Sequence, residues 1–267
     1  MGAVESPVPE VVESDAEPGL EPETAVARLG LIALSTDLTL ERDALRLIPP
    51  DRAALHTTRV DYANPTTPAN LAAMAPRIGA AAARIVPGVD LAAICFGCTS
   101  ASVVIGEAAV DRAVAEGRPG VPVVTPPRAA RWAFAALGVR RIALLTPYLA
   151  ETTRPMARYF EEHGLGLASI RCLGMADDRL MARLSRGTLV AEAEEADAAG
   201  AEALFISCTA VPALGVVAEL EKRLGKPVVC SNQACLWSML HLAGLGAEAA
   251  GPGALFARAL PADRPAA

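Results

Sequence analysis

The second half of this chain repeats the apolar segments of its first half in the same order, roughly 105 to 111 residues later. The matching segments are 31–37 with 142–148, 94–100 with 205–210, and 123–126 with 228–231. This spacing is close to the length of one small domain and much longer than the unit of a solenoid. The sequence therefore predicts two similar lobes, each with a core of its own.

Within each lobe, short β-rich apolar runs alternate with longer segments that have helical spacing. The predicted strands are 29–35, 53–60, 91–97, 121–125, 141–147, 166–172, 202–207 and 227–231. The predicted helices are 67–86, 100–116, 127–137, 149–163, 188–199, 213–224 and 232–243. Such alternation favours parallel sheets that are covered by helices on both faces. We expect an α/β fold of two pseudo-symmetric lobes, with the active site in the cleft between them.

Composition separates a tail from the folded body. Residues 1–26 are rich in Glu and Pro and poor in large apolar side chains, which predicts a disordered acidic tail. We expect the first lobe to comprise 27–125 together with 232–250, and the second lobe to comprise 126–231. Residues 251–267 are expected to form a C-terminal segment. The return of 232–250 to the first lobe rests on the resemblance described below.

Charge and hydropathy exclude several classes of partner. The 267 residues are 52% apolar and carry a net charge of −6, with Lys222 and Lys226 as the two lysines. We therefore expect no nucleic-acid partner, because no concentrated basic face is available. We also expect no membrane partner, since no apolar run approaches the ~20 residues that cross a bilayer. The amino terminus lacks the pattern of a signal peptide, which predicts a cytoplasmic location.

Two Cys-Thr pairs, Cys98-Thr99 and Cys208-Thr209, each follow a predicted strand and precede a predicted helix. The free N–H groups and the dipole of a helix start favour an anion, which lowers the pKa of a thiol placed there. One such thiol in each lobe predicts a catalytic pair. A redox or zinc site at the C-x-x-C segment 95–98 is the alternative, but it lacks a second pair of ligands, and Cys95 is expected in the core.

Polar groups at the predicted strand ends extend the candidate site. The backbone N–H groups after each cysteine and the hydroxyls of Thr99, Ser100 and Thr209 can donate to a carboxylate or an enediolate. The hydroxyls of Thr99 and Ser100 can also cap their helix, and the two roles are compatible. Arg59 and Arg128 lie near strand ends and could pair with a carboxylate, although exposed arginines are more common.

Five short segments of this chain form a pattern. They are 35–37 (Ser-Thr-Asp), 98–100 (Cys-Thr-Ser), 145–148 (Leu-Thr-Pro-Tyr), 207–209 (Ser-Cys-Thr) and 225–234, which contains Ser-Asn-Gln-Ala. Together they resemble the aspartate/glutamate racemase superfamily, and within it the branch of maleate cis-trans isomerase and arylmalonate decarboxylase. The pattern is most similar to that of ectoine-utilisation racemase-like proteins. The resemblance implies two α/β lobes with the site between them and a last helix that returns to the first lobe.

The resemblance implies catalysis by two cysteines without a metal, pyridoxal phosphate, nucleotide or other cofactor. In racemases of the family, one thiolate removes the proton next to the carboxylate, and the opposite thiol delivers a proton to the other face. In maleate isomerase, one cysteine adds to the double bond, rotation follows, and elimination gives fumarate. Decarboxylases of the branch have glycine at the earlier position, so Cys98 argues against arylmalonate decarboxylation.

The resemblance also implies the substrate contacts, with Tyr148 matching a tyrosine that hydrogen-bonds a substrate carboxylate. The expected contacts are Ser35, Thr36, Asp37, Thr99, Ser100, Tyr148, Asp178, Thr209 and Ala210. Maleate isomerases carry asparagine near Asp37 and Asp178, and an ionised aspartate cannot donate a hydrogen bond as an amide can. Two acids would repel a dicarboxylate, so we expect an amino-bearing acid such as a diaminobutyrate derivative. The alternative for Asp178 is an exposed helix start.

We therefore predict a cofactor-independent isomerase or racemase of a small carboxylic acid, which we expect to be a homo-oligomer. A maleate cis-trans isomerase that works through a covalent cysteine adduct is the alternative within the family. A non-catalytic small-molecule-binding module and a thiol redox protein are the alternatives outside it.

Overall fold

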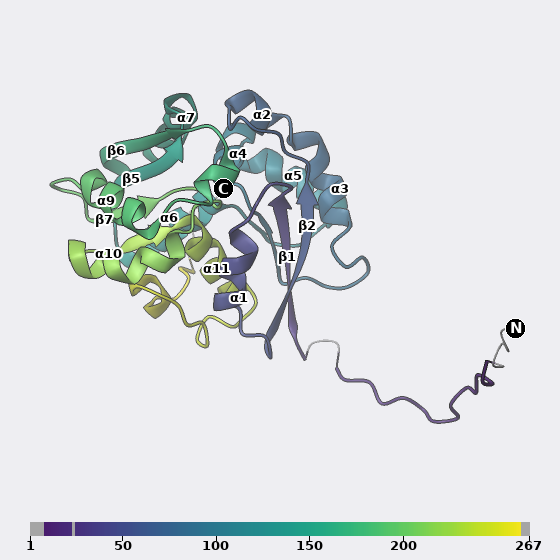
Figure 1. Cartoon of the computed structure of the whole chain (residues 1–267). Coiled ribbons are helices and arrows are strands. Elements are labelled where there is room, and N and C mark those ends of the chain that lie inside the picture. The colour runs from purple at the N-terminus through teal and green to yellow at the C-terminus, as the bar shows by residue number, and fades with distance from the viewer. Residues whose placement is uncertain (1–7, 23–24, 263–267) are drawn as a thin grey trace, which may run out of the picture.

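Two parallel four-stranded sheets form the centre of the molecule (Figure 1). The computed structural model describes residues 8–22 and 25–262. The first sheet has the spatial order β2-β1-β3-β4 and consists of β1 (Ala27–Leu34), β2 (Ala53–Val60), β3 (Ala93–Phe96) and β4 (Val123–Val124). The second has the order β6-β5-β7-β8 and consists of β5 (Arg141–Tyr148), β6 (Gly166–Met175), β7 (Ala203–Ile206) and β8 (Val228–Cys230). Because the two orders are equivalent, the prediction of a pseudo-symmetric two-lobe α/β fold is confirmed.

Helices cover the faces of both sheets. The first sheet is accompanied by α1 (Leu40–Leu47), α2 (Pro68–Ala72), η1 (Ala75–Arg77), α3 (Ile78–Ala83), α4 (Thr99–Ile105) and α5 (Glu107–Gly117). The chain then passes through α6 (Pro126–Leu137) to the second sheet. That sheet is accompanied by α7 (Ala150–Glu162), α8 (Asp178–Met181), α9 (Arg186–Ala196), η2 (Ala213–Val216) and α10 (Val217–Leu224). The last elements are α11 (Ser231–Leu242) and η3 (Ala254–Ala257).

Two helix predictions are corrected by the structure, and helix α1 is an addition to them. The predicted helix 67–86 is broken into α2, η1 and α3, because Pro76 has no N–H with which to continue a helical ladder. The predicted helix 100–116 divides at Gly106, whose φ of 88° is incompatible with an α-helix. Helix α1 was not predicted. It starts where Asp37 Oδ1 accepts hydrogen bonds from the N–H groups of Thr39 (3.0 Å) and Leu40 (2.9 Å).

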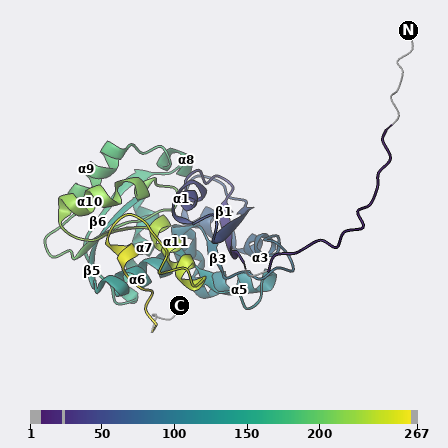
Figure 2. The same cartoon turned by 90° about the horizontal axis from the view of Figure 1, so that it is seen from below.

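The strand alternation of β1 builds two separate core layers. Leu29, Leu31 and Ala33 belong to the layer shared with α1 and α11, whereas Ile32 and Leu34 belong to the layer under α3 and α5. This follows from the period of two in a strand, which sends successive side chains to opposite faces. Helix α11 packs against α1 and β3 as well as against α6 and β8, so it contacts both lobes (Figures 1 and 2).

The described part of the acidic tail, residues 8–22, is exposed, has neither helix nor strand, and runs away from the folded body (Figures 1 and 2). The other predicted tail positions 1–7 and 23–24, and positions 263–267 of the predicted C-terminal segment, lie outside the described residues. Within the described chain, no helix combines the length and the apolar character needed to cross a bilayer.

Candidate active site

One cavity lies where the carboxyl ends of three strands from each sheet meet. Most of its lining residues are in or directly after β1, β2, β3, β5, β6 and β7, as expected for a site at the ends of parallel strands. The lining residues are Leu34, Asp37, Tyr62, Thr66, Leu71, Cys98, Thr99, Ser100, Tyr148, Asp178, Met181, Cys208, Thr209 and Ala210. The cavity therefore brings together one cysteine from each lobe.

Cys98 is the residue directly before α4, and its side chain is buried. Its Sγ lies 3.8 Å from the hydroxyl of Ser100, and the N–H of Ala101 also favours its thiolate. Burial outweighs both contacts and raises the pKa of the Cys98 thiol to about 12. Asp178 and Asp37 raise it further, because a second negative charge is unfavourable beside them.

Cys208 has a different local structure. It is not followed directly by a helix, because the next helical segment, η2, begins at Ala213, where the predicted helix 213–224 starts. Its φ is 104°, a backbone conformation that residues with a Cβ rarely adopt. Burial raises the pKa of its thiol to about 12, although the Tyr148 hydroxyl and the Ala210 N–H both favour the thiolate.

The expectation of a lowered thiol pKa is therefore wrong for both cysteines as the cavity stands. The cost of desolvating a thiolate exceeds the stabilisation from nearby N–H groups and hydroxyls. Both thiols are neutral near pH 7 in this arrangement. A thiolate therefore needs a bound group that stabilises its charge inside the buried cavity.

Two acids line the cavity. Asp37 is 4% exposed, and burial raises its pKa to about 6 against the opposing backbone hydrogen bonds from Leu40 and Thr39. Asp178 accepts hydrogen bonds from the Thr36 hydroxyl and from Asn64 Nδ2 (2.7 Å) and is 5% exposed. The alternative of an exposed helix start is thus wrong for Asp178. The lining residues include no Lys, Arg or His.

The Tyr148 hydroxyl is buried beside Cys208. Burial raises the pKa of this phenol well above its usual value, so it is a neutral donor. The described residues give its oxygen no well-formed hydrogen bond. A buried hydroxyl that lines a cavity and has no well-formed hydrogen bond within the protein is suited to bind a ligand oxygen.

The two threonine hydroxyls beside the cysteines are used within the protein. Thr99 Oγ1 donates to Ser231 Oγ (3.0 Å), and Thr209 Oγ1 donates to the carbonyl of Gly97 (3.0 Å). Since a hydroxyl has one proton to donate, neither is free to donate to a carboxylate in this arrangement, contrary to expectation. Ser100 and Ala210 line the cavity as expected.

Four other candidate residues lie outside the cavity lining. Ser35 accepts a hydrogen bond from the backbone N–H of Tyr62 (3.0 Å), and Thr36 reaches the site only through Asp178. Arg59 binds the carbonyls of Leu34 (2.9 Å) and Asp37 (3.0 Å) and forms an ion pair with Glu41. Arg128 is paired with Asp111 and Glu107. The hypothesis that either arginine binds a substrate carboxylate is therefore not supported by its position.

The loop after β2 was missed by the sequence analysis. Tyr62 and Thr66 line the cavity, and their hydroxyls form a hydrogen bond of 2.9 Å. Asn64, from the same loop, binds Asp178 of the other lobe. The available signal was position, because this polar loop follows a predicted strand just as the two cysteine segments do.

Hydrogen bonds of Thr66, which lines the cavity, join the two lobes. The N–H of Thr66 donates to the carbonyl of Ala176 (2.6 Å), and the Thr152 hydroxyl donates to the carbonyl of Thr66 (2.8 Å). The space between the lining residues is about 10 Å³, room for about one water molecule.

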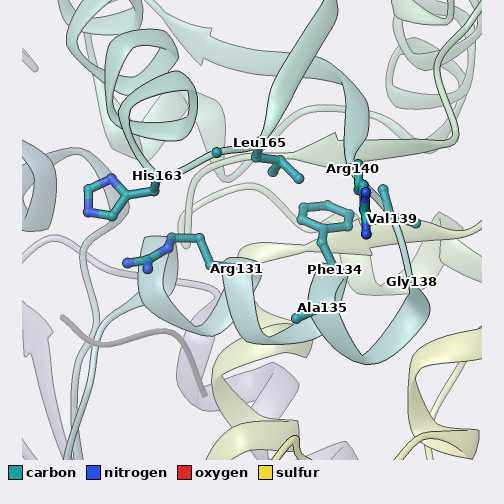
Figure 3. Close-up of a pocket in the computed structure, with 9 residues that line it drawn as sticks. Arg131, Phe134, Ala135, Gly138, Val139, Arg140, His163 and Leu165 are labelled. Atoms are coloured by element: carbon teal, nitrogen blue, oxygen red, sulfur yellow. The ribbon is translucent and has the colours of Figure 1, made fainter. Parts of the chain in front are cut away.

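A second, larger hollow of about 350 Å³ lies at the C-terminal ends of α6 and α7 (Figure 3). Phe134 and Leu165 form its middle, with Arg131 and His163 to one side and Val139 and Arg140 to the other. It contains no cysteine or carboxylate, so we do not place the reaction there. Across the described residues, no group of three or more His, Cys, Asp or Glu side chains is arranged to hold a metal ion.

Replacing Asp37 by Asn is expected to stabilise the protein at pH 8. The raised pKa means that ionised Asp37 costs the folded state on the order of 2–3 kcal/mol above pH 6. This cost disappears as the pH falls from 6 to 4, since the carboxyl is then protonated in the folded and the unfolded state. Asn can still accept the N–H bonds that start α1. Urea unfolding at pH 8 and pH 4 measures the difference, and equal stabilisation at both pH values would contradict a buried charge.

The fold and this cavity define the class of protein. Two α/β lobes with the same strand order, and one cysteine from each at a shared cavity, are the features of the Asp/Glu racemase-like fold. The chain belongs to the arylmalonate decarboxylase family, whose model matches residues 48–256.

Two relatives and one solved structure illustrate the relationship. An arylmalonate decarboxylase from Bordetella bronchiseptica is 38% identical over 141 residues, which cover 51% of this chain and 58% of that protein. A maleate isomerase from Nocardia farcinica is 29% identical over 86% of this chain and 95% of that one. The structure of a cysteine-to-serine variant of Nocardia farcinica maleate cis-trans isomerase, with a covalently bound succinylcysteine intermediate, matches with a TM-score of 0.78. It is 26% identical and is aligned over 86% of this chain and 98% of that one.

Proposed function

We propose that this protein is a cofactor-independent isomerase or racemase of a small carboxylic acid that carries an amino group. Cys98 and Cys208 would act from opposite sides of the substrate. As a thiolate, one sulfur takes the proton from the carbon next to the carboxylate, and the other thiol gives its proton to the opposite face. The step conserves both protons and charge, because the two sulfurs exchange their protonation states in each turnover. The observation that carries the proposal is that one small buried cavity is lined by a cysteine from each lobe.

The electrostatics of the cavity support an amino-bearing acid. Asp37 and Asp178 line it without a basic side chain among the lining residues, so a dicarboxylate would add two negative charges to two acids. It would also raise the thiol pKa values further. An ammonium group near the acids would instead offset the charges that disfavour the Cys98 thiolate. The similarity to ectoine-utilisation racemase-like proteins also remains a prediction.

Maleate cis-trans isomerisation through a cysteine adduct is the second candidate. The maleate isomerase relatives and the succinylcysteine intermediate of one of them favour it. Decarboxylation is less favoured, since the resemblance implies glycine in decarboxylases at the position of Cys98. The presence of both cysteines at one cavity also disfavours a non-catalytic binding module.

Incubation in deuterated water with a panel of small amino acids and dicarboxylic acids tests these alternatives. Proton NMR reports loss of the α-proton signal for a racemase and formation of fumarate for a maleate isomerase. We expect deuterium at the α-carbon of an amino-bearing acid. Faster turnover of maleate than of any amino acid would overturn the substrate proposal, and no exchange with any acid would favour the binding module.

Replacing Tyr148 by Phe is expected to lower kcat/KM about 10- to 100-fold, with a rise in KM. One hydrogen bond to a charged carboxylate contributes about 1.5–3 kcal/mol, and Tyr148 offers its hydroxyl to the cavity. Steady-state kinetics measure the change. Tyr159→Phe is the matched control, because Tyr159 is also buried but donates to Glu107 (3.0 Å) outside the cavity. An unchanged KM in the Tyr148 variant would exclude a carboxylate contact.

A further inference from the structure

The first turn of α11 contacts both cysteine segments. Ser231 Oγ accepts one hydrogen bond from the backbone N–H of Cys208 (3.0 Å) and another from the hydroxyl of Thr99 (3.0 Å). A single side-chain oxygen thus joins the residue after Cys98 to the backbone of Cys208. Hydrogen bonds within a sheet cannot make this connection, because the two cysteines follow strands of different sheets.

The next residue extends the connection. Asn232 Nδ2 donates to the carbonyl of Thr209 (3.0 Å) and to Asp43 Oδ2 of α1 (2.8 Å). Ser231 and Asn232 are almost completely buried, at 0% and 1% exposure. Buried polar groups are unfavourable unless they are hydrogen-bonded, so these partners account for the Ser231 hydroxyl and for the NH2 group of Asn232, whereas Asn232 Oδ1 has no hydrogen-bond partner among the described residues.

The Cys208 turn needs such support. Its φ of 104° is unfavourable for a residue with a Cβ and persists only where the surroundings hold it. Three consecutive residues of the turn are each held from outside their own segment. Cys208 is held by Ser231, Thr209 by Asn232, and the carbonyl of Ala210 by the Thr39 hydroxyl (2.7 Å).

We propose that Ser231 and Asn232 are positioning residues that hold the Cys208 turn in its strained conformation and set its place opposite Cys98. The proposal rests on the proposed function in one respect, since it takes Cys208 to be catalytic. The consequence is a rate effect, because a displacement of about 1 Å between reacting groups costs up to about 100-fold. Substrate affinity is less affected, since Ser231 and Asn232 do not line the cavity.

Ser231→Ala tests the role against Ser238→Ala. Ser238 lies on the same helix and is equally buried, but its hydroxyl has no hydrogen-bond partner in the described chain. We expect Ser231→Ala to lower kcat at least tenfold and to change KM less than threefold. We also expect amide hydrogen exchange in a peptide containing 208–210 to accelerate at least tenfold. Ser238→Ala is expected to do neither. If kcat of the two variants falls only in proportion to their loss of Tm, or if exchange is equal in both, the proposal is overturned.

A second pair of variants decides the case if Ser231→Ala does not fold. Thr99→Val removes the hydroxyl that reaches Ser231, whereas Thr99→Ser retains it. We expect kcat to fall in the valine variant and to recover in the serine variant, and equal values would overturn the link. If the wild type turns over no acid, the proposed function fails. The hydrogen-exchange comparison then still decides whether Ser231 holds the turn.

Discussion

Alanine at either Cys98 or Cys208 is expected to lower deuterium incorporation at the substrate α-carbon by more than about 10³-fold. The two-sided mechanism needs one sulfur to take a proton and the other to give one, so neither thiol can replace its partner. The double variant should be no slower than the slower single variant, since groups that act as a unit have non-additive effects. Proton NMR in deuterated water measures all three rates.

Cys172→Ser is the control for these variants, because Cys172 is exposed and does not line the cavity. Its exchange rate should stay within twofold of the wild type. Circular dichroism establishes whether each variant is folded. A folded Cys98→Ala variant that keeps exchange within tenfold of the wild type would leave a one-thiol mechanism and would remove the basis for racemisation.

Asn at position 37 is expected to change the substrate preference by about 10- to 100-fold. The variant removes the negative charge that an ammonium group would meet, and each tenfold corresponds to about 1.4 kcal/mol. The kcat/KM for an amino-bearing acid should fall, while that for a dicarboxylate should rise or stay constant. The ratio of the two values across the acid panel is the quantity to measure.

The pH dependence of kcat/KM is a second test of the role of Asp37 in substrate preference. Burial raises the pKa of Asp37 to about 6, so the wild-type kcat/KM for an amino-bearing acid should decline as the pH falls through 6. The carboxyl is then protonated and no longer attracts a cation. Asp37→Asn should lack this decline. Asp61→Asn is the matched control, since Asp61 follows β2 but is exposed and outside the cavity lining. The same substrate ratio in the Asp37 and Asp61 variants would refute the role of Asp37.

The repeat and the alternation of strands and helices were enough to predict the fold, because both follow from local sequence patterns that occur in each half of the chain. Periodicity identifies which face of a strand is buried without knowledge of its neighbours. The same reasoning located Cys98 and Cys208, since residues after parallel strands collect at one edge of a sheet. It failed for 67–86, where Pro76 interrupts an otherwise helical pattern, and for α1, whose start depends on the Asp37 side chain.

The pKa values of the two thiols and the hydrogen bonds within the site could be obtained only from the tertiary structure. The residue type and the helix-start rule predicted a lowered thiol pKa, but the degree of burial sets the larger contribution, and burial is a property of the assembled lobes. Likewise, Thr99 and Thr209 have the chemistry to bind a substrate, and only the folded chain shows their protons directed to Ser231 and Gly97.

The sequence by itself determined two repeated α/β lobes and the two cysteines at their strand ends, since those features follow from spacing along the chain. Only the tertiary structure decided how the lobes meet. It placed Asn64 against Asp178 and the first turn of α11 between the cysteine segments. These contacts join residues far apart in sequence, and their geometry depends on the packing of both lobes at once.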